Sequence, residues 1–342
     1  MKAVLFHEHG GPEVLKYEDA PDPKPGRGDV LIDVKATSIN HIDIFLRRGM
    51  PGVRVPLPKI AGCDAAGIIK EVGPDVSGLK PGDRVTINPG ISCGHCEFCA
   101  SGFGSQCTTY AMVGEHIDGA YAQLLRVPAH IVLPIPDSLS FEEAAAAPLV
   151  FLTAWSMMVG KGDIRPGEDV LILGAGAGVG TAAIQIAKLV GCRVIATAST
   201  DEKLARAKQL GADILINYRK DEFDKRVRDI TNKRGVDVVI DYIGSDTWVQ
   251  SLRSARKGAR VLTCGSTTGF APQTDLRHVF YRQVRVIGST MGSHKEFMDV
   301  MKCIFRGQLK PIIDRVLPLS EAHQGHELIE KREIFGKIVL TP

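Results

Sequence analysis

The glycine-rich segment Leu171–Gly180, with the sequence LILGAGAGVG, constrains the fold of this 342-residue chain more than any other part of it. It follows a short apolar run typical of a buried strand and precedes a stretch with helical spacing. Glycines in such a turn let the backbone approach a pyrophosphate, which then lies at the N-terminus of the helix. A turn of this composition can also serve only the packing of a strand on a helix, and that alternative stays open.

The residues around this turn alternate between strand-like and helix-like patterns, which favours dinucleotide binding. Strands are expected at Val170–Leu173, Val194–Ala198, Ile214–Ile216, Val236–Asp241, Arg260–Cys264 and Val284–Ser289, and helices at Gly178–Leu189, Asp201–Leu210, Asp221–Thr231 and near Trp248–Ala255. Apolar strands that alternate with helices indicate a parallel sheet covered on both faces. We therefore expect residues 151–290 to form an α/β domain with a doubly wound parallel sheet.

The first part of the chain has a different pattern, in which short strands are separated by proline and glycine turns. Over about 135 residues these runs predict a β-rich lobe. Its clearest strands are expected at Lys2–Phe6, Val30–Ala36 and Ala66–Val72. A helix at Lys295–Arg306 and a strand at Lys337–Leu340 do not extend the alternating series, so we expect them to return to this lobe. The β-rich domain is then 1–150 with 291–342.

Composition and charge exclude several partners. Lys and Arg number 42 against 39 Asp and Glu, which gives a net charge of +3, and no block of like charge occurs. Such a surface has no electrostatic footprint for nucleic acid or an anionic membrane. The apolar run near the N-terminus, Ala3–Phe6, is too short for a signal peptide, and the uncharged stretches 144–160 and 170–187 are broken by proline, polar residues or glycines. We expect a cytoplasmic protein with neither a nucleic-acid nor a membrane partner.

Four of the eight cysteines fall within 15 residues, at Cys93, Cys96, Cys99 and Cys107. Four thiolates can enclose a zinc ion in a tetrahedron, and a closed sulfur shell leaves no position for substrate. The spacing therefore predicts one structural Zn²⁺ per chain in a lobe at 90–110. An iron–sulfur cluster is the less favoured alternative.

The end of the second strand of the α/β domain bears on the choice of coenzyme. An NAD site usually has Asp or Glu there, which binds the ribose hydroxyls. Here the strand ends without an acid, and the nearby Ser199, Lys203 and Tyr218 suit a 2′-phosphate. We expect NADP, with NAD as the alternative, because Asp201 or Glu202 is close enough in sequence to reach a ribose. Ser199 with Glu202 also has the pattern of a capping box for the following helix.

With these features together, the sequence resembles the medium-chain dehydrogenase/reductase superfamily, which includes zinc alcohol dehydrogenases and quinone oxidoreductases. The resemblance covers the whole chain. It is carried by GPEVLKYEDAPDPKPG near the start, AGCDAAGIIKEVG at 61–73, GLKPGDRV at 78–85, the four cysteines, the glycine-rich turn and the ending FGKIVL. It implies a GroES-like catalytic domain, a Rossmann coenzyme domain and a homodimer or homotetramer that pairs near Val284–Ser289.

The resemblance also implies where the coenzyme and the substrate bind. Thr153 is expected near the nicotinamide and Gly244 near the adenosine. The coenzyme contacts are expected at Gly174, Ala175, Gly176, Gly178, Val179, Gly180, Ser199, Lys203, Tyr218, Asp241, Cys264, Gly265, Ser266, Ser289, Thr290 and Met291.

The sequence departs from the zinc alcohol dehydrogenases at the catalytic metal. Those relatives use a Cys, a His in a Gly-His-Glu motif, and a Cys or Asp near the domain junction. The first two positions match Asn40 and Cys63, and the junction 144–160 has no Cys, His, Asp or Glu. A three-ligand zinc site cannot be assembled from these positions. A replacement set of His41, Asp43 and Cys63 stays open.

Without a Lewis acid, the chemistry that remains is the reduction of an activated C=C bond or a quinone, small-molecule electrophiles that need hydrogen-bond donors and a proton. The candidate catalytic residues are Asn40 as a donor, His41 as a proton source, Asp64 as an orienting group, Cys63 and Thr153. In the alternative interpretation these residues have no catalytic role: Asn40 stabilises a loop, His41 lies on the surface and Cys63 packs in the core. We expect an NADPH-dependent reductase of quinones or α,β-unsaturated carbonyls. A zinc-dependent alcohol or aldehyde dehydrogenase with an atypical metal site, or a non-enzymatic NADPH-binding sensor, are the alternatives.

Overall fold

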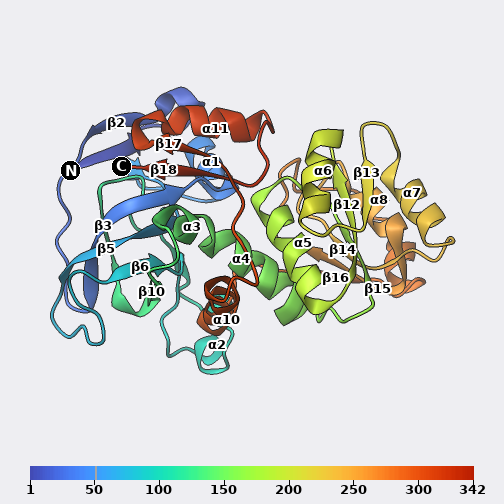
Figure 1. Cartoon of the computed structure of the whole chain (residues 1–342), viewed down its shortest axis with the longest axis horizontal. Coiled ribbons are helices and arrows are strands. Elements are labelled where there is room, and N and C mark those ends of the chain that lie inside the picture. Colours follow the sequence, from blue (N-terminus) through green and yellow to red (C-terminus); the bar gives the residue numbers. More distant parts are fainter. Residues whose placement is uncertain (51) are drawn as a thin grey trace. The chain divides into compact units, whose positions relative to one another are not determined.

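The computed structural model describes residues 1–50 and 52–342. The chain forms two compact units. The first unit consists of Met1–Leu149 and Ser293–Pro342, and the second of Val150–Gly292. Each unit contains its own sheets and helices (Figure 1).

The first unit is built mainly from antiparallel strands. Its main sheet has seven strands in the order β10-β6-β5-β3-β18-β17, with β9 also paired to β3. A three-stranded sheet, β2-β1-β4, and a two-stranded one, β7-β8, complete it. The strands are β1 (Lys2–Phe6), β2 (Lys16–Asp19), β3 (Asp29–Ser38), β4 (Lys59–Ile60), β5 (Asp64–Val72), β6 (Arg84–Ile87), β7 (Gly90–Ile91), β8 (Ala111–Met112), β9 (Leu124–Pro128), β10 (Val132–Pro134), β17 (Ile313–Pro318) and β18 (Lys337–Thr341).

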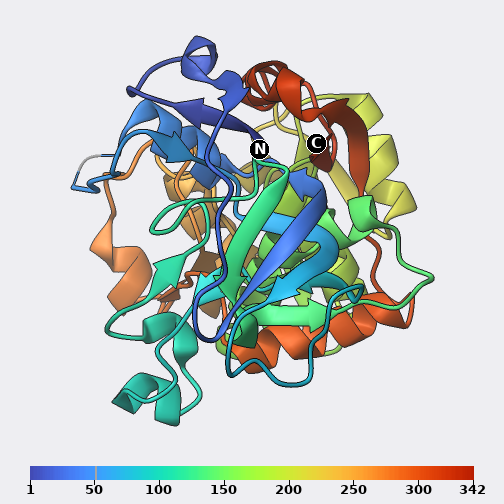
Figure 2. The ribbon, with the colours of Figure 1, turned by 90° about the vertical axis from the view of Figure 1, so that its left-hand side faces the viewer.

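The end of the chain completes the main sheet of this first unit. Strand β18 pairs antiparallel with β3, with Val339 opposite Ser38 and Leu340 opposite Thr37. Both ends of the chain, marked N and C, belong to this first unit (Figures 1 and 2). The helical segments of the unit are η1 (Pro12–Val14), α1 (His41–Arg48), α2 (Glu97–Ala100), η2 (Gly104–Gln106), η3 (Ala129–Ile131), α3 (Phe141–Ala146), α10 (His294–Phe305), η5 (Leu319–Glu321) and α11 (Ala322–Glu330). Helices α1 and α11 and strand β17 are not predicted by the sequence patterns.

Two apolar cores hold the first unit together. One contains buried side chains of β3, β5, β6 and β9, among them Ile32, Ile69, Ile87 and Leu125. The other joins β1 and β4 to α1, α11 and β18, so residues from both ends of the chain share it. Burial of this apolar surface is the main favourable contribution to folding.

The second unit is a six-stranded sheet in the order β13-β12-β11-β14-β15-β16, and each neighbouring pair of strands is parallel. This confirms the predicted α/β fold. Helix α4 (Pro148–Trp155) leads into the unit and continues as a π-helical segment, η4 (Ser156–Lys161), which the sequence does not predict. The other elements are β11 (Asp169–Ile172), α5 (Gly178–Val190), β12 (Arg193–Ala198), α6 (Asp201–Gln209), β13 (Ile214–Asn217), α7 (Phe223–Ile230), β14 (Val236–Ile240), α8 (Trp248–Ser254), β15 (Ala255–Thr263), α9 (Leu276–Phe280) and β16 (Arg285–Gly288).

The strand order reverses between β11 and β14. From β11 the chain runs outward through β12 and β13 and then crosses to the other side, to β14. In open parallel sheets, ligands bind beyond the carboxyl ends of the strands at such a reversal. The glycine-rich turn directly follows β11, so the fold places it where a ligand is expected. Within the described part of the chain, no helix is long and apolar enough to cross a membrane.

Strand β16 forms one edge of this sheet. Its only strand partner among residues 1–50 and 52–342 is β15, and its side chains are largely exposed. Several large apolar side chains nearby are exposed as well: Phe270, Leu276, Phe280, Tyr281 and Val286. An exposed apolar edge strand is a template for pairing with another chain.

We propose that β16 pairs with a second copy of the chain, so that the protein sediments as a dimer or tetramer at micromolar concentration. Val286→Lys places a charge on this edge and should shift the protein to monomers. The matched control is Val316→Lys on β17, another edge strand, because Val316 is 46% exposed against 44% for Val286. A monomeric wild type would contradict the proposal.

Candidate functional site

The glycine-rich turn of the second unit is held between three strands. Gly174 has a φ of +64°, a conformation that favours glycine. The N–H of Ala175 donates to the carbonyl oxygen of Thr197 at 2.8 Å, which ties the turn to β12. The Tyr242 hydroxyl donates to the carbonyl oxygen of Gly174 at 2.8 Å, which ties it to the segment after β14. The turn is therefore rigidly placed at the carboxyl end of β11.

Helix α5 starts close to this turn. A Cβ atom on Gly180 would lie 2.5 Å from the carbonyl oxygen of Gly174 and 2.7 Å from the Tyr242 hydroxyl, so only glycine permits this approach. The N-cap residue is Ala177, and no side chain caps the helix. The first N–H groups of a 13-residue helix thus remain available to an anion. These features, together with Gly176, Gly178 and Val179 in the same segment, fit the pyrophosphate of a dinucleotide.

The expected adenosine end lies at the carboxyl ends of β12 and β13, which pair there through Ala198 and Asn217. Ser199 follows β12, and Tyr218, which is 38% exposed, follows β13. Lys203 is in the first turn of α6. The structure thus places Ser199 and Tyr218 at the ends of neighbouring strands and Lys203 in the first turn of the helix that follows β12.

The capping box expected of Ser199 and Glu202 is not formed. The N-cap of α6 is Thr200, whose hydroxyl oxygen accepts a hydrogen bond from the N–H of Lys203 at 3.3 Å. The Asp201 carboxylate accepts from Asn217 Nδ2 at 2.7 Å and from Lys220 Nζ at 2.6 Å. Asp201 is therefore bound to the end of β13, and its hydrogen bonds are made within the protein.

Asp241, at the end of β14, is almost completely buried. Its carboxylate accepts from the N–H groups of Ile243 at 2.9 Å and Gly244 at 3.2 Å. It also accepts from the hydroxyls of Thr247 at 2.9 Å and Ser251 at 2.6 Å. With these bonds Asp241 organises the loop before α8. Its carboxylate therefore supports the loop and is not a free contact for the coenzyme.

The residues predicted near the nicotinamide gather around α4 and the segment after β16. The Thr153 hydroxyl donates to Met291 Sδ at 3.7 Å, and Met291 has a φ of +49°. Lys161 Nζ donates to the hydroxyls of Ser289 and Ser156, both at 3.0 Å. Sequence reasoning missed Lys161, whose only signal is its place as the first charge after an uncharged stretch.

The turn after β15 completes this edge of the sheet. Burial raises the pKa of the Cys264 thiol to about 12, so the thiol is neutral at physiological pH. The Ser266 hydroxyl donates to the carbonyl oxygen of Gly269, and the carbonyl oxygen of Gly265 accepts from Thr263 Oγ1 at 3.1 Å. Thr290, the last residue predicted here, is exposed.

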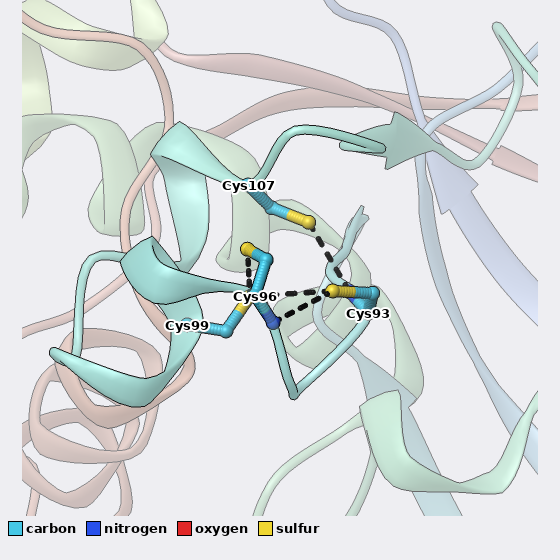
Figure 3. A group of neighbouring side chains, drawn as sticks. All are labelled: Cys93, Cys96, Cys99 and Cys107. Carbon is cyan, nitrogen blue, oxygen red and sulfur yellow. Dashed lines mark hydrogen bonds between the residues drawn. The ribbon is translucent and has the colours of Figure 1, made fainter.

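The four cysteines of the first unit converge on one point (Figure 3). All four sulfur atoms lie within 4.8 Å of one another. The N–H of Cys96 donates to Cys93 Sγ and the N–H of Cys93 to Cys107 Sγ, each at 3.3 Å. Hydrogen bonds from backbone N–H groups lower the pKa of Cys96 to about 6 and of Cys107 to about 7, whereas burial raises that of Cys99 to about 11. Thiolates are the form that binds metal, and four of them fit a closed tetrahedral zinc site.

A second polar cluster lies in the interior of the first unit, around Asp64. Its carboxylate is fully buried. It accepts from Ser38 Oγ at 2.8 Å, Asn40 Nδ2 at 2.8 Å and the N–H of Leu149 at 2.9 Å. The ammonium of Lys337 lies 3.5 Å away and balances its charge. We call these five residues the Asp64 cluster.

Asn40 is fixed within this cluster. Besides Asp64, its amide nitrogen donates to the carbonyl oxygen of Ser38 at 3.4 Å, and its amide oxygen accepts from Lys337 Nζ. We expected Asn40 to donate a hydrogen bond to the substrate. In the structure its N–H groups are already used within the protein, by the buried carboxylate of Asp64 and the carbonyl oxygen of Ser38. Lys337 was missed by sequence reasoning, although a lysine within the apolar run of FGKIVL is a visible signal.

Asp43 is the centre of a neighbouring group of buried residues. Its carboxylate accepts from the N–H groups of Asn40 at 2.8 Å and Gly62 at 3.1 Å, and from the Tyr121 hydroxyl at 3.2 Å. Burial raises the pKa of Asp43 to about 6. The thiol of Cys63, also fully buried, lies 3.5 Å from it. The Tyr121 hydroxyl is in turn 3.1 Å from His326 Nε2.

The replacement metal set of His41, Asp43 and Cys63 is not assembled. His41, the first residue of α1, is exposed, whereas Asp43 and Cys63 are fully buried. Outside the four cysteines, no three His, Cys, Asp or Glu side chains in the described residues bring their ligand atoms close enough to share an ion.

Cys96→Ser tests the structural zinc site. The variant should lose the metal and the local structure of 93–107, because one of four ligands is gone. Affinity for the coenzyme should stay nearly unchanged, since the glycine-rich turn belongs to the other unit. Metal analysis and a coenzyme titration measure both effects, with Cys303→Ser as the control for a cysteine outside the cluster. An equal loss of coenzyme binding would show that the cluster is not an independent element.

Comparison with known proteins covers both units. The family described as "Alcohol dehydrogenase GroES-like domain" matches residues 26–137, and the one described as "Zinc-binding dehydrogenase" matches residues 178–306. An alcohol dehydrogenase of Geobacillus stearothermophilus is 34% identical over 343 residues, which cover 99% of both chains. An acryloyl-coenzyme A reductase of Sulfurisphaera tokodaii is 29% identical over all of both chains.

A solved structure of an NAD-dependent alcohol dehydrogenase has 45% identity and a TM-score of 0.96 over all of both chains. The likeness therefore extends through the GroES-like unit, the parallel-sheet unit and the segments that join them. The chain belongs to the medium-chain dehydrogenase/reductase superfamily, in its zinc-type alcohol dehydrogenase-like group, and is an oxidoreductase.

Proposed function

We propose that this chain is an NADPH-dependent reductase of α,β-unsaturated carbonyl compounds or quinones, which transfers hydride without a metal ion at the reacting centre. The observation that carries the proposal is the Asp64 cluster. Asn40, at a position where zinc-dependent relatives are expected to have a metal ligand, is hydrogen bonded to Asp64 and Lys337. An amide held in this way is not free to bind a metal.

The state of Cys63 supports the same conclusion. Burial, with the negative charges of Asp43 and Asp64, raises the pKa of its thiol well above the usual range. The thiolate is the form that binds metals, and a neutral buried thiol behaves as a small apolar group. Of the two matched positions, Asn40 therefore offers no free ligand, and Cys63 would first have to lose its proton to bind zinc.

The reaction class follows from what remains. Oxidation of an unactivated alcohol relies on a Lewis acid to stabilise the alkoxide, a contribution of several kcal/mol. Addition of hydride to an activated C=C bond needs only hydrogen-bond donors for the developing oxyanion and a proton. The full-length relative named as an acryloyl-coenzyme A reductase supports this class of acceptor, since an acryloyl group is an α,β-unsaturated acyl group.

The coenzyme would be held by residues of the second unit. The glycine-rich turn and the start of α5 would hold its pyrophosphate, and Thr153, Ser289 and Met291 would lie by the nicotinamide. When bound, the reduced nicotinamide supplies the hydride. Ser199, Lys203 and Tyr218 favour NADPH, and Asp201 is already engaged by Asn217 and Lys220. NADH is the competing coenzyme, because a similar solved structure is named as an NAD-dependent alcohol dehydrogenase.

The coenzyme proposal predicts tighter binding of NADPH than of NADH. Lys203→Ala should weaken NADPH by about ten- to a hundredfold, because a charge-assisted hydrogen bond contributes about 1.5–3 kcal/mol. Ala198→Asp should invert the preference, since a carboxylate there accepts from ribose hydroxyls and repels a phosphate. Lys208→Ala, the same change at an exposed position of α6, is the control. Titrations of the wild type and the variants with both coenzymes measure this preference. A wild type that binds NADH more tightly than NADPH would contradict the assignment.

The reaction class is tested by anaerobic NADPH oxidation against quinones, enones, enoyl-CoA thioesters and aldehydes, together with metal analysis. We expect turnover with quinones or α,β-unsaturated carbonyls and one zinc per chain. Efficient alcohol oxidation with two zinc ions per chain would instead establish a zinc-dependent alcohol dehydrogenase, the function named for several relatives. Coenzyme binding without turnover of any acceptor would favour a non-enzymatic sensor.

A further inference from the structure

The second unit contains a cavity of about 210 Å³ near the amino ends of β11 and β16. All residues that line it belong to this unit. The charged ones are four arginines and two acids: Arg165, Arg256, Arg260, Arg285, Asp163 and Glu168. Glu168 directly precedes β11, whereas the glycine-rich turn directly follows that strand. The cavity is therefore separate from the place expected for the pyrophosphate of the coenzyme.

Two of the arginines lie side by side on neighbouring strands. Arg260 of β15 and Arg285 of β16 are partners in the register of this parallel strand pair. Side chains of such partners point to the same face of a sheet, where like charges destabilise the pairing. An anion between the two guanidinium groups would remove the repulsion between them.

The guanidinium of Arg260 is buried and still has hydrogen-bond donors to offer. The residue is 5% exposed, and the carboxylate of Glu168 balances its charge. Its Nη1 donates to the carbonyl oxygens of Gly162 and Asp163, both at 2.6 Å, and its Nη2 donates to Glu168 Oε1. A guanidinium has five N–H groups. The one on Nε and the second one on Nη2 thus have no acceptor among residues 1–50 and 52–342, and both can bind a ligand in the cavity.

The two acids of the lining already have partners. Glu168 binds Arg260, and its Oε2 accepts from the backbone N–H of Arg165 at 2.9 Å. Asp163 accepts from Arg165 Nε at 3.2 Å. Hydrogen bonds from Arg165, with smaller contributions from the charges of Arg260 and Arg285, lower the pKa of Asp163. Arg285 itself is exposed and forms no ion pair within the part of the chain that the structure describes.

The fourth arginine, Arg256, depends on an acid outside the lining. Its Nε donates to Asp237 Oδ1, and the same oxygen accepts from Arg234 Nη2 at 2.7 Å. One carboxylate therefore serves two guanidinium groups. Together with the unpaired Arg285, this leaves positive charge in excess around the cavity.

We propose that this cavity binds a phosphate group, as inorganic phosphate or as the phosphate of a monoester, between Arg260 and Arg285. Guanidinium groups match phosphate oxygens with paired N–H donors, and such charge-assisted bonds are stronger than those between neutral groups. The ligand offsets the charge of Arg285 and accepts from the unused N–H groups of Arg260. The site does not depend on which reaction the protein catalyses.

Isothermal titration calorimetry of the coenzyme-saturated protein with inorganic phosphate tests the proposal. Bound coenzyme removes the anion positions at the glycine-rich turn from the measurement. We expect about one phosphate per chain, and a rise in melting temperature that sodium chloride at the same ionic strength does not produce. A parallel titration with glycerol 3-phosphate distinguishes the sources. Binding of both ligands indicates a site open to monoesters, whereas binding of inorganic phosphate alone restricts the site to the free ion.

Variants locate the binding within the cavity. Arg285→Gln should weaken phosphate binding by about ten- to a hundredfold, because it removes charge-assisted hydrogen bonds. Arg285→Lys, which keeps the charge but not the paired donors, should fall between this variant and the wild type. Arg165→Gln, at a position outside β16, should weaken binding as well, because Asp163 loses its cation and then repels the anion. Coenzyme affinity should not change in any of them.

The matched control is Arg226→Gln, the same change at an exposed arginine of α7 in the same unit. An equal loss of phosphate binding in this control would show general attraction of anions and would overturn the proposal. Phosphate binding that disappears when the coenzyme is bound, or an equal rise in melting temperature with sodium chloride, would overturn it as well.

Discussion

The buried ion pair between Asp64 and Lys337 is the interaction on which the first unit depends. A carboxylate and an ammonium are both expensive to remove from water, and loss of one partner of such a pair typically destabilises a protein by about 3–5 kcal/mol. Here the remaining oxygen lone pairs are used by Ser38, Asn40 and the N–H of Leu149. The pair therefore joins β3, the start of α1, β5, the start of α4 and β18 at one point.

This arrangement also limits the chemistry of the first unit. Because the carboxylate of Asp64 needs donors, Asn40 is drawn into the cluster and its amide is not available elsewhere. The thiol of Cys63 stays neutral because burial, together with the nearby carboxylates of Asp43 and Asp64, raises its pKa. The metal-free chemistry that we propose would be a consequence of how buried charge is balanced in this region. The fold itself is that of the superfamily.

The features that could be predicted from the sequence are those with local signals. The glycine-rich turn, the alternating strands of the parallel sheet and the spacing of the four cysteines are each contained in a short segment. The pair of Asn40 and Lys337 could not be predicted, because its partners are 297 positions apart. At the start of α6, the sequence pattern indicated Ser199 as the cap, whereas the N-cap in the structure is Thr200.

The position of Lys337 near the end of the chain affects folding during synthesis. The ribosome makes the chain from the N-terminus, and domains generally fold as units as they emerge. The second unit is a continuous segment and can fold as soon as residue 292 has left the exit tunnel. The first unit has to wait, because the cation that balances Asp64 and the strand that pairs with β3 come within the last six residues. In the nascent chain, the second unit is therefore complete before the one that precedes it in the sequence.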